Sequence, residues 1–232
     1  MKEIQKPPLP SLQANAEERY CFVDLPQAKE ATLVIGNVVY PLAEPDYFPM
    51  AVLVHVLGGT PFSRLFMNLR EAKEYAYSAF SGLELFQSGG YYVITAAVIP
   101  SAASASIREI LRELDRITRD KISNFELEQA KSYLIGHFPL QVSRPDQLSR
   151  LISELMAFSL GDAHWGRFSD SIGLVDAEKI FEVAQKYLAP KPVVVIVGDQ
   201  EVLLGQLRDL DRLEVYDLKG VLLYTLVKGV RG

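Results

Sequence analysis

The sequence predicts an α+β fold in which helices pack on one face of a mainly antiparallel sheet. Three observations predict it: β-branched and aromatic runs of strand length near both ends of the chain, a glycine-containing hairpin signal, and a central block with apolar residues at helical spacing. With 232 residues, of which 49% are hydrophobic and 23% charged, the chain can bury a core that needs neither metal nor disulfide.

Four runs predict strands in the first half of the chain. The runs YCFVDLP (20–26) and ATLVIGNVVY (31–40) are separated by the polar residues QAKE. The runs YAYSAFSGLELF (75–86) and YYVITAAVIP (91–100) flank QSGG, whose glycines supply the positive φ angles of a tight hairpin. We therefore expect the latter two runs to form an antiparallel pair.

Two helices are predicted between these strand pairs. Asp46 is a candidate N-cap for a buried helix, which carries Pro49 in its first turn and stops at Gly58 and Gly59. A short second helix is expected from Arg64 to about Lys73.

The middle of the chain predicts four helices. The first has the apolar positions Ile107, Ile110, Leu111, Leu114 and Ile117. Ser123 and Glu126 form a capping box for the next helix, which should run towards Gly136. After an interruption at Pro145, a third helix presents Leu148, Leu151, Ile152, Leu155 and Met156. The segment GDAHWGRF (161–168) is predicted to be a loop, and Asp176 to cap a fourth helix that ends before Pro190.

Two last strands are expected in PVVVIVG (192–198), as a fully buried strand, and in LEVYDL (213–218). The domain prediction is a proline-rich arm over 1–18, one α+β domain over 19–220 and an apolar tail over 221–232. An apolar strand at a terminus would be an unprotected sheet edge, so we expect the tail to favour contact with a partner.

Charge and hydropathy exclude several classes of function. The net charge of −5, without a dense basic block, makes nucleic acid an unlikely partner. No apolar run reaches the 18 or so residues of a membrane span. The first residues are polar and show no secretory signal, so we expect a cytoplasmic location if the chain is complete and allow a periplasmic one if it is a fragment.

The sequence predicts no metal site made by this chain alone. His55, His137 and His164 are far apart in the sequence, and none belongs to a His-x-x-Glu-His motif. We expect His55 to pack against its own helix and His137 to end another. Cys21 is interpreted as a small buried hydrophobe.

Other polar motifs have simpler explanations than catalysis. The glycine-rich segment LGGTPFSR (57–64) follows a helix and is interpreted as a structural turn. Helix capping and surface solvation account for the pairs Glu126 with Glu128 and Asp209 with Asp211, to which we assign no catalytic role.

A more specific signal is the segment VLGGTPFSRLFMNLREAKEYAYSAFSG (56–82), in which Arg70 and Tyr77 lie seven residues apart. It resembles the signature segment of the inactive half of the insulinase, pitrilysin and mitochondrial-processing-peptidase superfamily of zinc metalloproteases. The segments NFELEQAKSYLIGHFPLQVSRPDQLSRLISELMAFSLG and VDAEKIFEVAQKYLAPKPVVVIVGD resemble the helical block, the last helix and the core strand of that family, so the similarity covers about 19–220.

The resemblance implies a peptide-cleaving chamber closed by two similar halves. Zinc would be bound by the other half, and this chain would bind no cofactor itself. Arg70 and Tyr77 would reach across to the peptide and its developing oxyanion, roles for which a guanidinium and a phenol are suitable donors. The function predicted is therefore the non-catalytic, substrate-binding half of a bipartite zinc endopeptidase, inactive alone, with the zinc-bearing half and a peptide as partners.

One position departs from the family pattern. The family usually has glycine where this sequence has Glu74, so we expect a different turn there, which affects the direction in which Tyr77 projects.

Three alternatives remain open at this stage. Arg70 could form a surface ion pair with a nearby glutamate while Tyr77 is an ordinary strand aromatic. The chain could be a structural or assembly subunit with the same fold and no role in proteolysis, or a peptide-binding module that pairs with extended chains at a sheet edge. Homo- and hetero-oligomers are both compatible with the sequence.

Overall fold

The computed structural model describes residues 17–39, 45–86, 88–158, 160–161 and 163–228. Within them, seven strands form one sheet in the order β3-β4-β2-β5-β1-β6-β7. The strands are β1 (Arg19–Asp24), β2 (Ala31–Val39), β3 (Ala76–Phe86), β4 (Gly89–Val98), β5 (Val193–Gly198), β6 (Arg212–Tyr216) and β7 (Leu222–Val227). The predicted arm up to residue 16 lies outside the described residues.

The sheet is mixed but mostly antiparallel, as expected. Neighbouring strands are antiparallel everywhere except at β1, which runs parallel to β5 on one side and to β6 on the other. The predicted hairpin is confirmed: β3 pairs with β4 from Phe86 opposite Gly89 onwards, and Gly89 has a φ of 149°.

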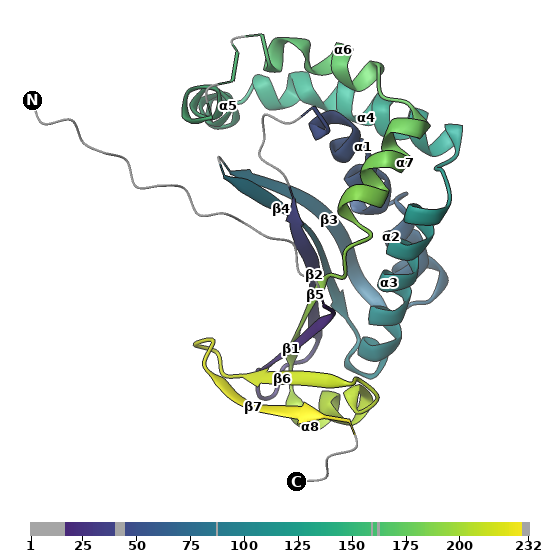
Figure 1. Cartoon of the computed structure of the whole chain (residues 1–232), viewed down its shortest axis with the longest axis vertical. Helices are drawn as coiled ribbons and strands as arrows, with labels where there is room; N and C mark the ends of the chain where they lie inside the picture. The colour runs from purple at the N-terminus through teal and green to yellow at the C-terminus, as the bar shows by residue number, and fades with distance from the viewer. Residues whose placement is uncertain (1–16, 40–44, 87, 159, 162, 229–232) are drawn as a thin grey trace, which may run out of the picture.

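Helices cover one face of this sheet (Figure 1). They are α1 (Tyr47–Gly58), α2 (Arg64–Phe66) continued by the π-helical segment η1 (Met67–Ala72), α3 (Ala103–Arg119), α4 (Asn124–Val142), α5 (Pro145–Ala157), α6 (Phe168–Gly173), α7 (Ala177–Tyr187) and α8 (Gln200–Leu203). Single turns of 3-10 helix occur at Pro100–Ala102, Trp165–Arg167 and Leu204–Leu207. The α+β class predicted from the sequence is therefore confirmed.

The core lies between the sheet and the helices. Strand β2 alternates buried and half-buried residues along its length, because alternate side chains of a strand point to opposite faces. Its buried positions face helices that contribute further fully buried side chains. The largest fully buried side chains come from both strands and helices: Phe22, Leu33, Ile35, Met50, Leu53, Leu57, Leu65, Leu69, Tyr92, Ile94, Ile110 and Ile117.

Two of the three N-caps predicted from the sequence form as expected. The capping box predicted at Ser123 is present, because its hydroxyl accepts from the Glu126 amide at 3.2 Å and the Glu126 carboxylate accepts from the Ser123 amide at 2.8 Å. Asp176 also caps α7 as predicted. Asp46 occupies the N-cap position of α1, but its carboxylate accepts instead from Lys186 Nζ at 2.8 Å and from the Tyr187 hydroxyl at 3.0 Å.

Three predictions about local structure were wrong, and a fourth was right in extent but not in helix type. Helix α4 does not end near Gly136 but continues to Val142 with Pro139 inside it, so His137 is not at a helix end. The predicted loop at 161–168 contains a 3-10 turn and the first residue of α6. Strand β5 is not fully buried, since its alternate valines are half-buried on the face that carries no helices. The predicted second helix exists, but its second half is π-helical.

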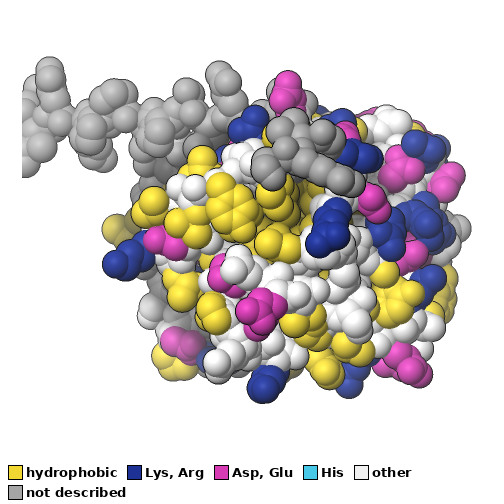
Figure 2. Space-filling model, turned by 90° about the horizontal axis from the view of Figure 1, so that it is seen from below, with side chains coloured by type: hydrophobic (Ala, Val, Ile, Leu, Met, Phe, Trp, Pro, Cys, Tyr) yellow, Lys and Arg dark blue, Asp and Glu magenta, His cyan; other side chains and the backbone are white. Residues whose placement is uncertain are grey.

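The apolar tail continues the sheet of this domain. Strand β7 pairs with β6 along its backbone, yet Leu222, Leu223, Tyr224, Leu226 and Val227 each keep 41–54% of their surface exposed. Figure 2 shows hydrophobic side chains gathered on this lower end of the molecule, where Figure 1 places β7 and α8. The expected contact of these side chains with a partner remains a prediction.

Candidate functional site

The junction between η1 and β3 holds the two residues singled out in the sequence. Leu69 is fully buried and fixes η1 against the core. The Lys73 amide donates to the Asn68 carbonyl at 3.1 Å, five residues back, as in a π-helix. Arg70 is therefore carried on a widened turn that ends just before the strand that carries Tyr77.

The turn between them is left-handed at Glu74, where φ is 57°. This corrects the expectation of a different turn, because the glutamate adopts the backbone conformation that glycine would take without strain. A non-glycine residue in this region costs about 1–2 kcal/mol, which the surrounding structure must offset.

Tyr77 lies in a β-bulge at the start of β3. Ala76 pairs with Val98 and Ser78 with Ala97, so Tyr77 is the extra residue between them. Its side chain is 57% exposed, and its hydroxyl has no hydrogen-bond partner in the described part of the chain. The bulge thus aims a phenol outward from the core.

Arg70 is also exposed, with 51% of its side chain accessible. Its guanidinium lies 5.0 Å from the centre of the Phe66 ring, and its Nε is 4.0 Å from Glu71 Oε1, a long and weak ion pair. Most of the guanidinium donors therefore face solvent. Within the described residues no hydrogen bond joins Arg70 to Tyr77, and neither residue lines any of four hollows on the described surface.

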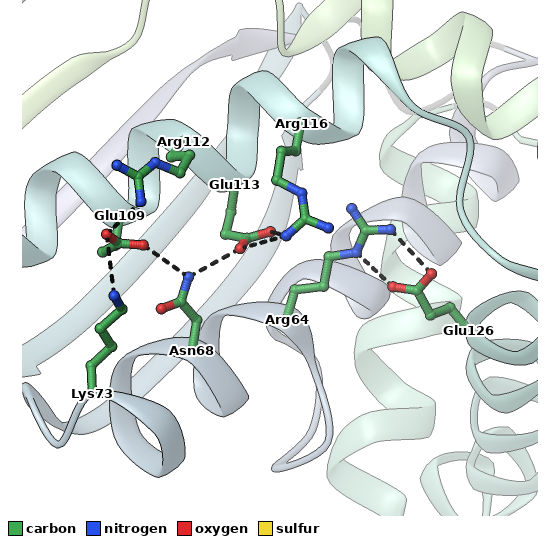
Figure 3. A network of polar contacts seen from close by, with 8 residues as sticks. All are labelled: Arg64, Asn68, Lys73, Glu109, Arg112, Glu113, Arg116 and Glu126. Atoms are coloured by element: carbon green, nitrogen blue, oxygen red, sulfur yellow. Dashed lines mark hydrogen bonds and ion pairs between the residues drawn. The ribbon is translucent and has the colours of Figure 1, made fainter.

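A network of polar contacts fixes the helix that carries Arg70 (Figure 3). At its start, Arg64 donates to both carboxylate oxygens of Glu126 on α4, at 2.6 and 3.1 Å. One turn later, the amide nitrogen of Asn68 donates to Glu109 at 3.3 Å and to Glu113 at 3.0 Å, both on α3.

The same network continues to the end of η1. Lys73 Nζ is 3.7 Å from Glu109, which also binds Arg112 at 2.8 Å. Arg116 pairs with Glu113 at 3.2 Å. Because α3 and α4 belong to the packed core, these contacts hold the segment around Arg70 from both ends.

The Arg64–Glu126 pair is the strongest of these contacts electrostatically. Partial burial alone would raise the pKa of Glu126, but hydrogen bonds from Arg64 and Ser123 lower it to about 2. Sequence reasoning found the capping role of Glu126 and missed its bond to Arg64. No local spacing could have revealed it, because the two residues lie 62 positions apart on different helices.

The histidines do not form a metal site. His55 and His137 stack on Tyr133, with ring centres 4.7 and 5.3 Å away. Burial, with a smaller contribution from His137, lowers the pKa of His55. His164 stacks on Phe48 instead. Within the described ranges no three His, Cys, Asp or Glu side chains gather as a metal would require.

Two further sequence interpretations concern membranes and Cys21. None of the described helices is long and apolar enough to cross a bilayer. Cys21 is buried in β1, and burial raises the pKa of its thiol, which suits a small hydrophobe better than a nucleophile.

Comparison with known proteins identifies relatives of this chain. Residues 2–134 match the family described as Peptidase M16 inactive domain. An uncharacterized zinc protease of Mycobacterium tuberculosis is 35% identical over 102 residues, which are 44% of this chain and 23% of that protein. The alpha subunit of the rat mitochondrial-processing peptidase is 29% identical over 171 residues, which are 68% of this chain and 32% of that subunit.

The fold has solved counterparts. The crystal structure of a peptidase M16 inactive domain from Pseudomonas fluorescens superposes with a TM-score of 0.72 at 19% identity, over 84% of this chain and 47% of that chain. This likeness concerns the fold alone. The chain spans about a quarter to a third of the length of the curated relatives it matches.

Proposed function

We propose, on the premise that this chain belongs to the Peptidase M16 inactive domain family, that it is the substrate-binding half of a bipartite zinc endopeptidase. In this proposal the other half, on another subunit or another part of a longer chain, supplies the zinc and the general base. This chain closes the chamber and steadies the peptide. Alone it would not cleave peptides.

The observation that supports the proposal most is that the side chains of Arg70 and Tyr77 are both exposed to solvent. Both side chains are more than half exposed, on neighbouring segments that the core and the polar network of Figure 3 hold in place. Exposure leaves the N–H donors of Arg70 and the O–H donor of Tyr77 accessible to a peptide, because the Arg70 ion pair with Glu71 is long at 4.0 Å.

Their chemistry suits the stabilisation of a peptide carbonyl as it gains negative charge. A guanidinium offers several N–H donors and remains charged at all physiological pH values, and a phenol offers one O–H donor. Donors fixed before the reaction, in a chamber that excludes water, contribute more than they would in solution. The left-handed turn at Glu74 and the bulge at Tyr77 lie just before and at the residue that carries the phenol, and so affect its orientation.

Reconstitution tests this proposal. The chain is mixed with a purified zinc-bearing M16 half, and cleavage of a fluorescent peptide library is followed with and without it. We expect cleavage only in the mixture, and a loss of kcat/KM with Arg70→Ala or Tyr77→Phe. If a mixture containing the chain with both substitutions cleaves peptides at an undiminished rate, the substrate-binding role of Arg70 and Tyr77 is contradicted.

A second candidate, an assembly subunit without a role in proteolysis, is favoured by one observation. Strand β7 presents apolar side chains on both of its faces and forms the outer edge of the sheet. Such an edge suits a permanent protein contact. Complex formation with the zinc-bearing half that leaves its peptidase rate unchanged would support this candidate over the first.

A further inference from the structure

The guanidinium of Arg70 is not fixed by the backbone alone, because the side chain that bears it is long and 51% exposed. An arginine side chain in solvent has many rotamers of similar energy. A group that stabilises a reacting carbonyl contributes most when it is held in place before the reaction. The contacts that restrain Arg70 therefore decide how well its donors are prepared for a substrate.

Carboxylates restrain Arg70 only weakly. Its Nε lies 4.0 Å from Glu71 Oε1, and the Glu71 side chain is 54% exposed, so this ion pair contributes little. The nearby arginines differ in this respect (Figure 3). Arg64, Arg112 and Arg116 each lie 2.6–3.2 Å from a carboxylate oxygen. Arg70 thus remains outside the network of close ion pairs that surrounds its segment.

An aromatic ring contacts Arg70 instead. Phe66 is the last residue of α2, and the centre of its ring is 5.0 Å from Cζ of Arg70. This distance is within the ~6 Å over which a cation is attracted to the face of a ring. The two residues are four apart on a continuous helical segment, where such residues are neighbours. Phe66 is only 6% exposed, so packing in the core holds its ring in place.

A ring and a carboxylate restrain a guanidinium in different ways. A carboxylate accepts hydrogen bonds from the N–H groups and so occupies them. A ring attracts the cation through its quadrupole and leaves N–H donors for another acceptor. At an exposed site this attraction favours the rotamers that contact the ring about two- to fivefold, the factor that corresponds to about 0.5–1 kcal/mol.

We propose that Phe66 is a positioning residue for Arg70. Its buried ring holds the guanidinium in the orientation in which it meets the peptide, and it leaves the N–H donors available. The inference rests on the proposed function only for the statement that Arg70 meets a peptide. The contact between ring and guanidinium belongs to this chain alone, so failure of the inference and failure of the proposed function are distinguishable.

NMR spectroscopy of the whole chain tests the contact without any partner. The side-chain signals of Arg70 are assigned by their loss in Arg70→Lys. We expect an NOE between the Phe66 ring and the Arg70 side chain, and a ring-current shift of the Arg70 protons that disappears in Phe66→Leu. Phe181→Leu is the matched control, because this ring lies 6.0 Å from another cation, Lys121 Nζ. It should leave the Arg70 signals unchanged.

A double-mutant cycle in the reconstituted peptidase tests the effect on the reaction. Phe66→Leu should lower kcat/KM about two- to fivefold, as the loss of the cation–π contact requires. In the Arg70→Ala background it should have no further effect, because the group that Phe66 positions is absent. Phe181→Leu should leave the rate unchanged in both backgrounds. Circular dichroism establishes that each variant is folded.

Two results would overturn the inference. The first is the absence of an NOE between the Phe66 ring and the Arg70 side chain in the unmodified chain, which can be measured even if Phe66→Leu fails to fold. The second is an equal loss of kcat/KM from Phe66→Leu with and without Arg70, because a ring that acted only through core packing would give this result. An NOE together with cleavage that Arg70→Ala leaves unchanged would support the contact and contradict the proposed function instead.

Discussion

The backbone amide of Tyr75 donates a hydrogen bond of 2.8 Å to the carbonyl oxygen of Leu69, across the left-handed residue Glu74. This bond closes the end of the helical segment that carries Arg70, and the Tyr75 carbonyl then accepts from the Ile99 amide at 2.9 Å. The helix end and the start of β3 are thus joined through a single residue. The direction of Tyr77 depends on this junction.

Replacement of Glu74 by glycine should therefore be tolerated. It relieves the left-handed strain, about 1 kcal/mol, while greater freedom of the unfolded chain offsets part of the gain. We expect the free energy of unfolding in urea to rise by at most about 1 kcal/mol. Glu71→Gly, in the helical part of η1, is the control and should lose about 1 kcal/mol. Equal losses in both variants would contradict the role given to this turn.

Arg70→Ala should reduce kcat/KM of the reconstituted peptidase about ten- to a hundredfold, because a charge-assisted hydrogen bond contributes roughly 1.5–3 kcal/mol. Tyr77→Phe should have a smaller effect, since it removes one neutral donor. Arg108→Ala and Tyr91→Phe, both exposed and outside this junction, serve as controls and should leave the rate unchanged. If the controls lose as much as the two test variants, the effect is structural.

The Arg64–Glu126 pair predicts a pH dependence of stability. The pKa of Glu126 falls from an ordinary 4.5 to about 2 on folding, so its contribution is complete above pH 4.5 and is lost as the pH falls towards 2. Discounted for the exposed part of the side chain, this is about 1–2 kcal/mol. Urea unfolding should therefore separate wild type from Glu126→Gln most at pH 7, with the difference shrinking towards pH 3. Glu128→Gln, at a mostly exposed carboxylate, should show no such trend.

Two glycines in helices should respond to alanine in opposite directions. A Cβ at Gly58, the last residue of α1, would lie 2.3 Å from the backbone nitrogen of Ser81 on β3, so Gly58→Ala must push helix and strand apart. We expect a loss of about 1–3 kcal/mol. A Cβ at Gly136 in α4 meets nothing within 4 Å, and Gly136→Ala should gain about 0.5–1 kcal/mol. Thermal denaturation measures both, and a stabilising Gly58→Ala would refute the packing described for α1.

Strand β7 predicts concentration-dependent association of the isolated chain. Leu223→Lys or Leu226→Lys should reduce that association in sedimentation velocity, because charge on an edge strand opposes pairing. Leu174→Lys is the control, since this residue is 85% exposed and directly follows α6, which Figure 1 shows at the opposite end of the molecule from β7. A chain that stays monomeric at all accessible concentrations would show that the edge needs a different partner.

Much of the fold could be predicted from the sequence because its signals are local. The capping box at Ser123, the cap at Asp176 and the glycine hairpin each depend on residues within a few positions. The end of α4 could not be predicted: Pro139 removes one backbone donor, yet the helix continues through it to Val142. The 3-10 turn at Trp165 is stabilised at long range, where its Nε1 donates to the Leu151 carbonyl at 3.2 Å.

The candidate site was predictable in composition but not in geometry. The spacing of Arg70 and Tyr77 is visible in the sequence, and so is the substitution of Glu74 for glycine. The π-helical turn, the bulge at Tyr77 and the left-handed glutamate are features of the three-dimensional structure, and the bulge depends on pairing with the distant strand β4. Local propensity contains no information about such contacts.

Strand β1 lies between β5 and β6, with Arg19 opposite Val193 and Cys21 opposite Glu214. A ribosome therefore makes β1 more than 160 positions before either of its neighbours emerges. Until then β1 cannot pair with another strand in its native position. Its apolar residues therefore remain exposed to solvent or are bound by a chaperone. The domain should consequently fold late and slowly, with β1 the last vulnerable segment of the nascent chain.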